Sequence, residues 1–193
     1  MKRPAWQLLK WRDVPVVFDW TVLLGLPWFY YRHGGLIGMG MAFMSFLFLL
    51  LAHELGHAAI AKWRGVPVIE IRLFILHGYC EHERPDKKSD EVWIAWGGVA
   101  AQFVVLLFAW VLAALLMSQA HELYRHAEPM LRILITVNLF IILFNLLPFP
   151  GLDGAKAWRV LPMAWKSWSR DRRLKRESKA VAADIIEQLR KRR

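Results

Sequence analysis

Three residues in the run LLLAHELGHAAI, at positions 49–60, have the types and spacing of a metal-dependent hydrolytic site. His53 and His57 are four positions apart, so on a helix both imidazoles lie on one face and can bind the same metal ion. Glu54 projects beside them, where its carboxylate can take a proton from a water molecule on the metal. A metal in such a site lowers the pKa of that water to about 7 and polarises a scissile carbonyl.

The surroundings of these three residues have the composition of a membrane interior. An acidic side chain at the centre of a membrane helix costs about 2.5–3.5 kcal/mol on insertion scales, and ionisable residues at that depth are functional by default. A single histidine on an apolar face is usually a packed core residue, whereas two histidines and an acid at these offsets indicate a site. We therefore expect a metal ion to compensate for their burial.

A catalytic zinc also needs a third protein ligand and one open position. The segment NLLPFPGLDG, at positions 145–154, supplies a candidate in Asp153. The helix that carries the histidines and the helix before this segment are expected to run in the same direction, which places Asp153 at a comparable depth. The alternative is a simple turn residue, because Leu-Asp-Gly after prolines is also good turn chemistry.

The elements that must position these residues are apolar segments close to the ~20 residues of a spanning helix. Four such segments lie at positions 14–31, 36–63, 93–117 and 131–147. Hydrophobic residues make up 56% of the 193 residues, and the eleven tryptophans suit membrane interfaces. Asp19, Pro15 and Pro27 interrupt the first segment, which makes it the weakest. We predict an all-α membrane protein with about four transmembrane helices.

The charges predict how these helices are oriented. The chain has 26 lysines and arginines against 16 acidic residues, a net charge of +10. Basic residues concentrate before the first segment, between the second and third, and after the fourth, which predicts that both termini are cytoplasmic. This orientation explains the charge without nucleic acid as a partner. No small-residue cleavage site follows the basic N-terminus, so we expect a retained first helix rather than a signal peptide.

Two regions do not follow the pattern of spanning helices. Residues 66–83 are rich in β-favouring side chains that partly alternate with charged ones, which predicts a small membrane-associated β-region between the second and third helices. The basic segment 166–193 predicts an amphipathic helix on an anionic membrane surface. Its apolar face would hold Leu174, Val181, Ile185 and Leu189. We therefore divide the chain into a transmembrane domain, 1–165, and a cytoplasmic tail, 166–193.

With both motifs in place, the sequence resembles the site-2 protease family of intramembrane zinc metalloproteases. That family pairs a His-Glu-x-x-His helix with a downstream Asn-x-x-Pro-x-Pro-x-Leu-Asp-Gly motif. This chain carries HELGH at 53–57 and NLLPFPGLDG at 145–154, in the same order. Two separate motifs are far more specific than either alone, and the resemblance covers roughly residues 36–158.

The resemblance implies a zinc metalloendopeptidase that cleaves the transmembrane segment of a membrane-protein substrate. It implies one catalytic Zn²⁺ ion held by His53, His57 and Asp153, with Glu54 as the general base. It also implies that Asn145 supports the substrate backbone or the transition state. The expected location is a bacterial or archaeal cytoplasmic membrane, where the lipid bilayer surrounds the protein. Whether a regulatory membrane partner binds it stays open.

The chain departs from the family pattern in two places. Many members open the next helix with Gly-Pro-x-x-Asn, whereas this chain has GGVAAQ at 97–102, with Val99 for the proline and Gln102 for the asparagine. Gln102 keeps an amide, so we expect it to support substrate or transition state with altered geometry. The usual Leu-Asp-Gly-Gly ending is Leu-Asp-Gly-Ala here, because Ala155 replaces the second glycine.

The predicted β-region carries a second group of potential ligands in the run HGYCEHE. Its Gly78 fits a glycine common in the family's β-region, where an exposed strand could pair with an unwound substrate. His77, Cys80 and His82 could bind a second metal, or Cys80 could regulate the zinc, because thiolate is a good zinc ligand. The alternative is that they are ordinary polar strand and loop residues. Cys80 is the only cysteine, so no intrachain disulfide forms and no oxidising compartment is implied.

Two other functions fit parts of the sequence. A catalytically silent relative that binds membrane partners would be favoured by loss of Glu54 or of a ligand, and the altered GGVAAQ stretch keeps it open. A metal-binding or transport protein would need polar residues along a path through the membrane, for which Asp19 and Thr21 are the evident candidates. The sequence does not identify the substrate, a regulator or an oligomeric state.

Overall fold

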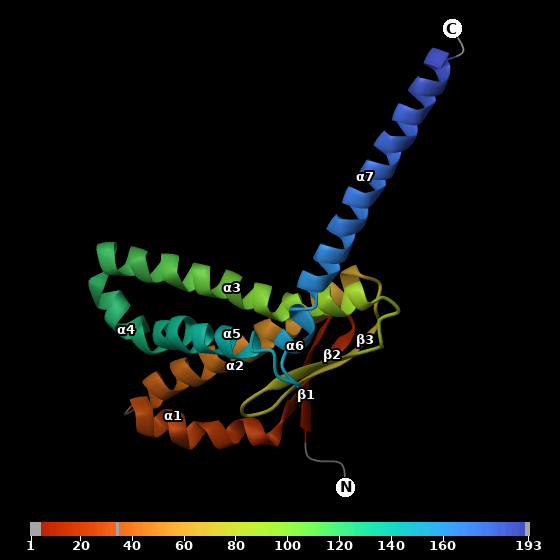
Figure 1. The fold of residues 1–193 in the computed structure, drawn as a ribbon. Helices are drawn as coiled ribbons and strands as arrows, with labels where there is room; N and C mark the ends of the chain where they lie inside the picture. The colour runs from red at the N-terminus through yellow and green to blue at the C-terminus, as the bar shows by residue number, and fades with distance from the viewer. Residues whose placement is uncertain (1–4, 34, 192–193) are drawn as a thin grey trace. The chain divides into compact units, whose positions relative to one another are not determined.

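The computed structural model describes residues 5–33 and 35–191, with the side chains of these residues except at positions 5, 8, 33 and 180–191. The chain forms two compact units, residues 1–157 and 158–193 (Figure 1). The first unit contains the sheet, the remaining helices and all the predicted site residues. The second unit consists mainly of one long helix.

Three helices are long and apolar enough to cross a membrane. They are α2 (Leu36–Trp63), α3 (Lys88–Gln119) and a third helix over His121–Asn145, which matches the predicted segments 36–63, 93–117 and 131–147. The third helix is continuous but irregular. Its parts are α4 (His121–Arg132), the π-helical turn η2 (Ile133–Val137) and α5 (Asn138–Asn145).

The first predicted segment, 14–31, differs from the expected spanning helix. It divides into the strand β2 (Val14–Asp19), the 3₁₀ helix η1 (Trp20–Gly25) and the eight-residue helix α1 (Leu26–His33). The valine-rich start of the segment favours a strand. Asp19 then ends the strand, because its side chain accepts a hydrogen bond from the Thr21 N–H at 3.0 Å and caps η1.

The chain leaves the sheet through η1 and α1 and returns to it through α2. β2 pairs in parallel with β3 (Val68–Leu73), although η1, α1 and α2 lie between them in the sequence. The two strands therefore lie at the same end of α2, and α1 packs beside the first half of α2. Phe29 of α1 contacts Phe43 and Phe46, each with ring centroids 5.7 Å apart.

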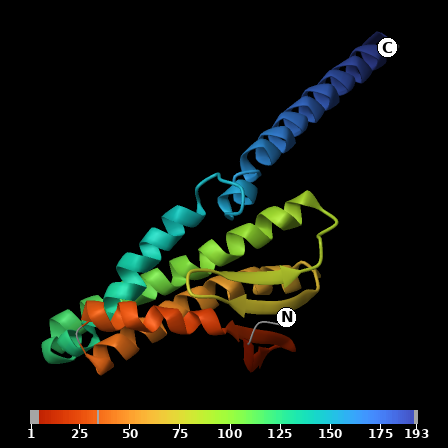
Figure 2. The same cartoon turned by 90° about the horizontal axis from the view of Figure 1, so that it is seen from below.

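The sheet has four strands in the order β1-β2-β3-β4. β1 (Ala5–Trp11) and β2 are antiparallel, as are β3 and β4 (Gly78–His82), whereas β2 and β3 are parallel. The β3–β4 hairpin confirms the predicted β-region, whereas β1 and β2 were not predicted. Figures 1 and 2 show the sheet at the end of the helices that is opposite α4. The buried side of the sheet joins the helical core through Val16, Ile71 and Leu73, all 0% exposed.

Close contact between α2 and α3 depends on a pair of glycines. A Cβ atom added to Gly56 would overlap the carbonyl oxygen of Gly97, and a Cβ on Gly97 would be similarly close to the carbonyl of Gly56. Small residues at helix crossings in membranes allow this approach of the two backbones. The contact lies one residue before His57, so it holds the histidine-bearing turn of α2 against α3.

The second unit is the helix α7 (Val160–Lys191) with the residues that precede it. Trp165 and Trp168 are exposed and their ring centroids are 5.4 Å apart, while the Arg172 guanidinium lies 3.8 Å from the centroid of Trp168. Leu174 is also exposed. The other residues of the predicted apolar face, Val181, Ile185 and Leu189, lie outside the described side chains.

Candidate metal centre

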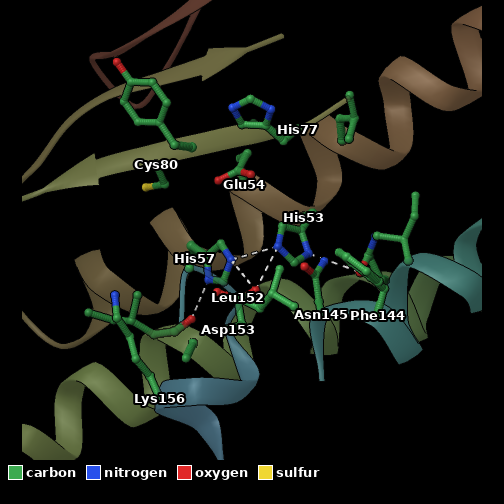
Figure 3. A pocket seen from close by; sticks show the side chains of 18 of the residues that line it. His53, Glu54, His57, His77, Cys80, Phe144, Asn145, Leu152, Asp153 and Lys156 are labelled. Carbon is green, nitrogen blue, oxygen red and sulfur yellow. Dashed lines mark hydrogen bonds and ion pairs between the residues drawn. The ribbon is translucent and has the colours of Figure 1, made fainter. Parts of the chain in front are cut away.

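The two predicted histidines converge with Asp153 on one point. His53 and His57 lie one turn apart on α2, are buried, and have their Nε2 atoms 3.0 Å from each other. The Asp153 Oδ2 atom lies 3.0 Å from His53 Nε2 and 3.2 Å from His57 Nε2. These three side chains are the group among the described residues whose ligand atoms could hold one metal ion (Figure 3).

The loop after α5 brings Asp153 back to the helix. Pro148 and Pro150 prevent the helix from continuing, because proline lacks the N–H that a helix requires. Gly151 then has φ +94°, a left-handed conformation that favours glycine. After Asp153 the chain enters α6 (Gly154–Ala157), whose end is tied to α3 by a hydrogen bond of 3.2 Å from Trp96 Nε1 to the Ala157 carbonyl.

Each imidazole is oriented by a hydrogen bond on the side away from Asp153. His57 Nδ1 lies 2.6 Å from the backbone carbonyl oxygen of Ile94, and His53 Nδ1 lies 3.1 Å from Oε1 of Gln102. Both partners are acceptors, so both Nδ1 atoms carry the proton and both Nε2 atoms present a lone pair to Asp153. Gly98 leaves the space that this requires, since a Cβ there would lie 2.6 Å from His53 Cε1.

This arrangement fits a cation. Two Nε2 lone pairs and a carboxylate oxygen face one another, and Asp153 Oδ2 is buried without a hydrogen bond among the described residues. Burial by itself would raise the pKa of Asp153, but the adjacent imidazoles outweigh it and hold that pKa below its usual value. Two imidazoles and an ionised carboxylate are the ligand set of a catalytic zinc site with an open position.

Glu54 lies beside this centre without belonging to it. Its carboxylate is buried and lies between the histidine pair and strand β4 (Figure 3). Gly78 at the start of β4 is necessary for this placement, because a Cβ there would lie 2.6 Å from Cγ and 2.7 Å from Oε1 of Glu54. Glu54 is thus positioned between the metal ligands and a strand, where it can act as a base.

All these groups face one cavity of about 880 Å³. Its wall includes Glu54, the three potential ligands and the residues of β4 that point inward. Asn145, at the end of α5, also lines the cavity, so its expected role toward the substrate stays a prediction. The cavity is large enough for a length of extended peptide beside the candidate metal centre.

Gln102 has a more specific position than the sequence suggested. It is fully buried on α3, and its side-chain oxygen accepts the hydrogen bond from His53. Asn138 in turn donates from Nδ2 to the Gln102 backbone carbonyl at 3.0 Å. Gln102 therefore orients a potential ligand, and its predicted support of substrate or transition state stays a prediction. Sequence reasoning missed Ile94 and Gly98, although the Gly97-Gly98 pair in an apolar helix was a signal of close packing.

The second group of potential ligands, on the β3–β4 hairpin, does not converge. His77, Cys80 and His82 line the cavity, but they form no ligand cluster among the described residues. Burial, with a smaller contribution from the Glu54 carboxylate, raises the pKa of the Cys80 thiol to about 12. Without a cation beside it, this thiol therefore stays protonated at neutral pH.

The chain was compared with known proteins by sequence and by structure. No family model matches it. It is 32% identical over 164 residues to a zinc metalloprotease of Methanocaldococcus jannaschii, covering 80% of this chain and 44% of the relative. It is also 32% identical over 151 residues to stage IV sporulation protein FB of Bacillus subtilis, covering 76% and 48%. The chain thus spans less than half the length of these two relatives.

The fold is similar to a solved structure from the same archaeon. The structure of a site-2 protease of Methanocaldococcus jannaschii matches with a TM-score of 0.63 and 22% sequence identity. The match covers 82% of this chain and 71% of that chain. At this identity the match establishes the shared fold, an arrangement of membrane helices with a small mixed sheet.

Proposed function

The chain belongs to the site-2 protease family of zinc metalloproteases, and we propose that it is an intramembrane endopeptidase that cuts the transmembrane segment of a membrane-protein substrate. The observation that carries this proposal is the convergence of His53, His57 and Asp153 beside Glu54, in the wall of a cavity between apolar helices. A buried site of this kind suits a substrate that is itself within the bilayer.

In this proposal His53, His57 and Asp153 hold one zinc ion, and each histidine keeps its orientation through Gln102 or the Ile94 carbonyl. When bound, zinc supplies Lewis acidity, which activates a water molecule near neutral pH and polarises a carbonyl group. Glu54 accepts a proton from the water molecule while the water oxygen forms a bond to the peptide carbonyl carbon. Glu54 then returns this proton to the amide nitrogen, and the carbon–nitrogen bond breaks.

Strand β4 supports the binding of an unwound substrate. It is the last strand in the sheet order, so within the described sheet it pairs on one side only, with β3. Gly78, Cys80 and His82 of this strand line the cavity. An extended segment of substrate could add to the free edge through backbone hydrogen bonds and present its carbonyl groups to the metal centre.

We also propose that the site faces the cytoplasm and that both termini are cytoplasmic, in the cell membrane of a prokaryote. Four basic side chains lie in the sequence between the end of α2 and the start of α3, and Lys62 and Lys88 lie at the adjoining ends of these helices, whereas Arg125 and Arg132 are the basic residues between α3 and the end of α5. This bias supports a cytoplasmic position for the sheet and the metal centre. Labelling of single introduced cysteines in intact cells tests the orientation.

The experiment that tests the activity compares wild type with Glu54→Gln, purified in detergent, for zinc content and for cleavage of a transmembrane substrate that contains helix-breaking residues. We expect zinc in both proteins and cleavage by wild type alone. Cleavage by Glu54→Gln would overturn its role as base. Absence of zinc from both would overturn the metal centre.

The same experiment separates the two other functions. Zinc in both proteins without cleavage of any membrane protein in a panel would favour a silent relative that binds partners. A transport function would instead be favoured by zinc flux into liposomes that contain the protein. The presence of Glu54 and of all three ligands in one buried group favours the enzyme.

A further inference from the structure

A second cavity lies beside the candidate active site. Its volume is about 360 Å³, and every described residue in its wall is apolar. The wall is built from four parts of the first unit: η1 with α1, the first half of α2, the β3–β4 turn and the π-helical turn η2. None of the groups assigned to zinc or to proton transfer lies in this wall.

The two cavities share a wall. Phe46 of α2, Leu76 of the β3–β4 turn and Val137 of η2 line both of them. These residues come from three different elements, so the small cavity lies directly beside the large one. A peptide held at the metal centre would therefore lie next to the apolar cavity.

The distance between the two sites can be expressed in residues of an extended peptide. Phe46 precedes His53 by seven positions on α2, which is about 10 Å along a helix with a rise of 1.5 Å per residue. An extended peptide advances about 3.3 Å per residue, and alternate side chains point to the same side. The cavity is thus in reach of a side chain two to four residues from the scissile bond.

We propose that this apolar cavity is a specificity subsite, which accepts one large apolar side chain of the substrate two to four residues from the scissile bond. The inference rests on the proposed protease function. Its occupant is a substrate side chain because the cavity shares Phe46, Leu76 and Val137 with the active-site cavity, and its volume is large enough for a leucine or phenylalanine side chain. The chemistry of the wall excludes charged side chains, which would lose their hydration without gaining a partner.

Gly25, at the end of η1, provides a way to fill this cavity without altering the catalytic groups. A Cβ atom added there would meet side-chain atoms of Phe43 at 3.4 Å, Phe29 at 3.7 Å and Ile75 at 3.8 Å. The last two distances are ordinary van der Waals contacts, so Gly25→Ala is a tolerated control. A larger side chain at the same position extends into the cavity, so Gly25→Leu occupies part of the proposed subsite.

The test uses a panel of transmembrane substrates that differ at one residue near the scissile bond, which is Ala, Leu, Phe or Asp. We expect wild type and Gly25→Ala to cleave the Leu or Phe substrate with kcat/KM about 10-fold or more above the Ala substrate, as apolar pockets discriminate. We expect Gly25→Leu to lose this preference while it still cleaves the Ala substrate. An unchanged preference in Gly25→Leu would overturn the subsite.

A binding measurement keeps this inference distinct from the protease function itself. A substrate with a diazirine-bearing leucine analogue at the same position is irradiated with Glu54→Gln, and the labelled residues are found by mass spectrometry. We expect labelling of Ile133 and the β3–β4 turn, and its loss in the double variant with Gly25→Leu. Labelling of these residues by a photoreactive acyl chain, but not by the substrate, would overturn the proposal and assign the cavity to lipid.

Failure of the two ideas gives different results. If wild type cleaves no substrate in the panel, the proposed function fails, whatever the labelling. If wild type cleaves the whole panel at similar rates and Gly25→Leu does the same, the protease function stands and the subsite fails.

Discussion

Two regions of this protein carry histidines at spacings that suit a metal, and only one of them forms a site. On α2, His53 and His57 are four residues apart, and the helix places both Nε2 atoms against Asp153. On the β3–β4 hairpin, His77 precedes strand β4, and Cys80 and His82 are two residues apart on it. Alternate residues of a strand share a face, but the ligand atoms of His77, Cys80 and His82 do not converge on one point among the described residues.

The histidines of the two regions also differ in the partners of their ring atoms. Each histidine of α2 has its Nδ1 atom held by an acceptor on α3, which directs the Nε2 lone pair toward Asp153 and the candidate metal position. On the hairpin, His77 stacks on Phe74 at a centroid distance of 5.0 Å, and His82 Nδ1 donates to the Glu83 carbonyl at 2.7 Å. Ligand residues thus form a site when a neighbouring element orients them, and spacing alone is insufficient.

The largest effect expected from this comparison is the loss of a ligand. We expect Asp153→Ala to reduce zinc from about one ion per chain to near zero and to abolish cleavage, because two imidazoles alone do not complete a catalytic zinc site. Zinc is measured by mass spectrometry on protein purified without added metal. The matched control is His82→Ala, which should retain its zinc. Equal loss in both variants would mean that the hairpin also binds metal.

A second prediction separates the base from the ligands. Gly78→Ala places a methyl group within 2.6 Å of Glu54 Cγ, so the carboxylate must shift. Because a misplacement of about 1 Å can cost about 100-fold in rate, we expect cleavage to fall by about that factor with zinc content unchanged. Steady-state cleavage and zinc content are measured on one preparation. Loss of zinc together with activity would show that Gly78 supports the fold rather than the base.

A third prediction concerns the residue that orients His53. Gln102→Leu removes the acceptor of the His53 Nδ1–H at nearly constant volume, and loss of such a partner typically weakens metal affinity by about 10–100-fold. Competition with a chelator measures the affinity. Gln102→Glu keeps an acceptor at the same position and serves as the control. An affinity unchanged in Gln102→Leu would contradict the orienting role.

The smallest effect is expected on the hairpin. The pKa of Cys80 is raised to about 12, so at lower pH its thiolate fraction increases about tenfold for each unit by which the pH is raised. Alkylation by iodoacetamide should therefore become faster in parallel between pH 7 and 10. Mass spectrometry of the labelled peptide measures the rate. A rate that levels off near pH 7 would indicate an activated or metal-bound thiol. Cys80→Ser should leave zinc content unchanged.

Part of the candidate site could be predicted from the sequence alone. The pair His53 and His57 needs only helical geometry, since positions four apart on a helix always share a face. The position of Asp153 needed one further step. The helix that carries the histidines and the helix that precedes Asp153 had to run in the same direction. A small β-region over residues 66–83 was predicted from its partial alternation and its glycine, and the β3–β4 hairpin confirms it. These features depend on local geometry, and the structure has them.

The remaining features depend on contacts between segments distant in the sequence. The run 14–31 is apolar enough for a spanning helix, but β2 forms at its start because β1 and β3 supply the backbone partners of a strand. The orientation of the imidazoles by Gln102 and Ile94 requires the crossing of α2 and α3. His77, Cys80 and His82 looked similar to the helical pair, but His77 stacks on Phe74 and His82 bonds to the Glu83 carbonyl, so their ligand atoms do not converge. Sequence by itself determined which groups could bind a metal, and only tertiary structure decided which of them meet, because a ligand set requires atoms from separate elements within a few ångströms of one point.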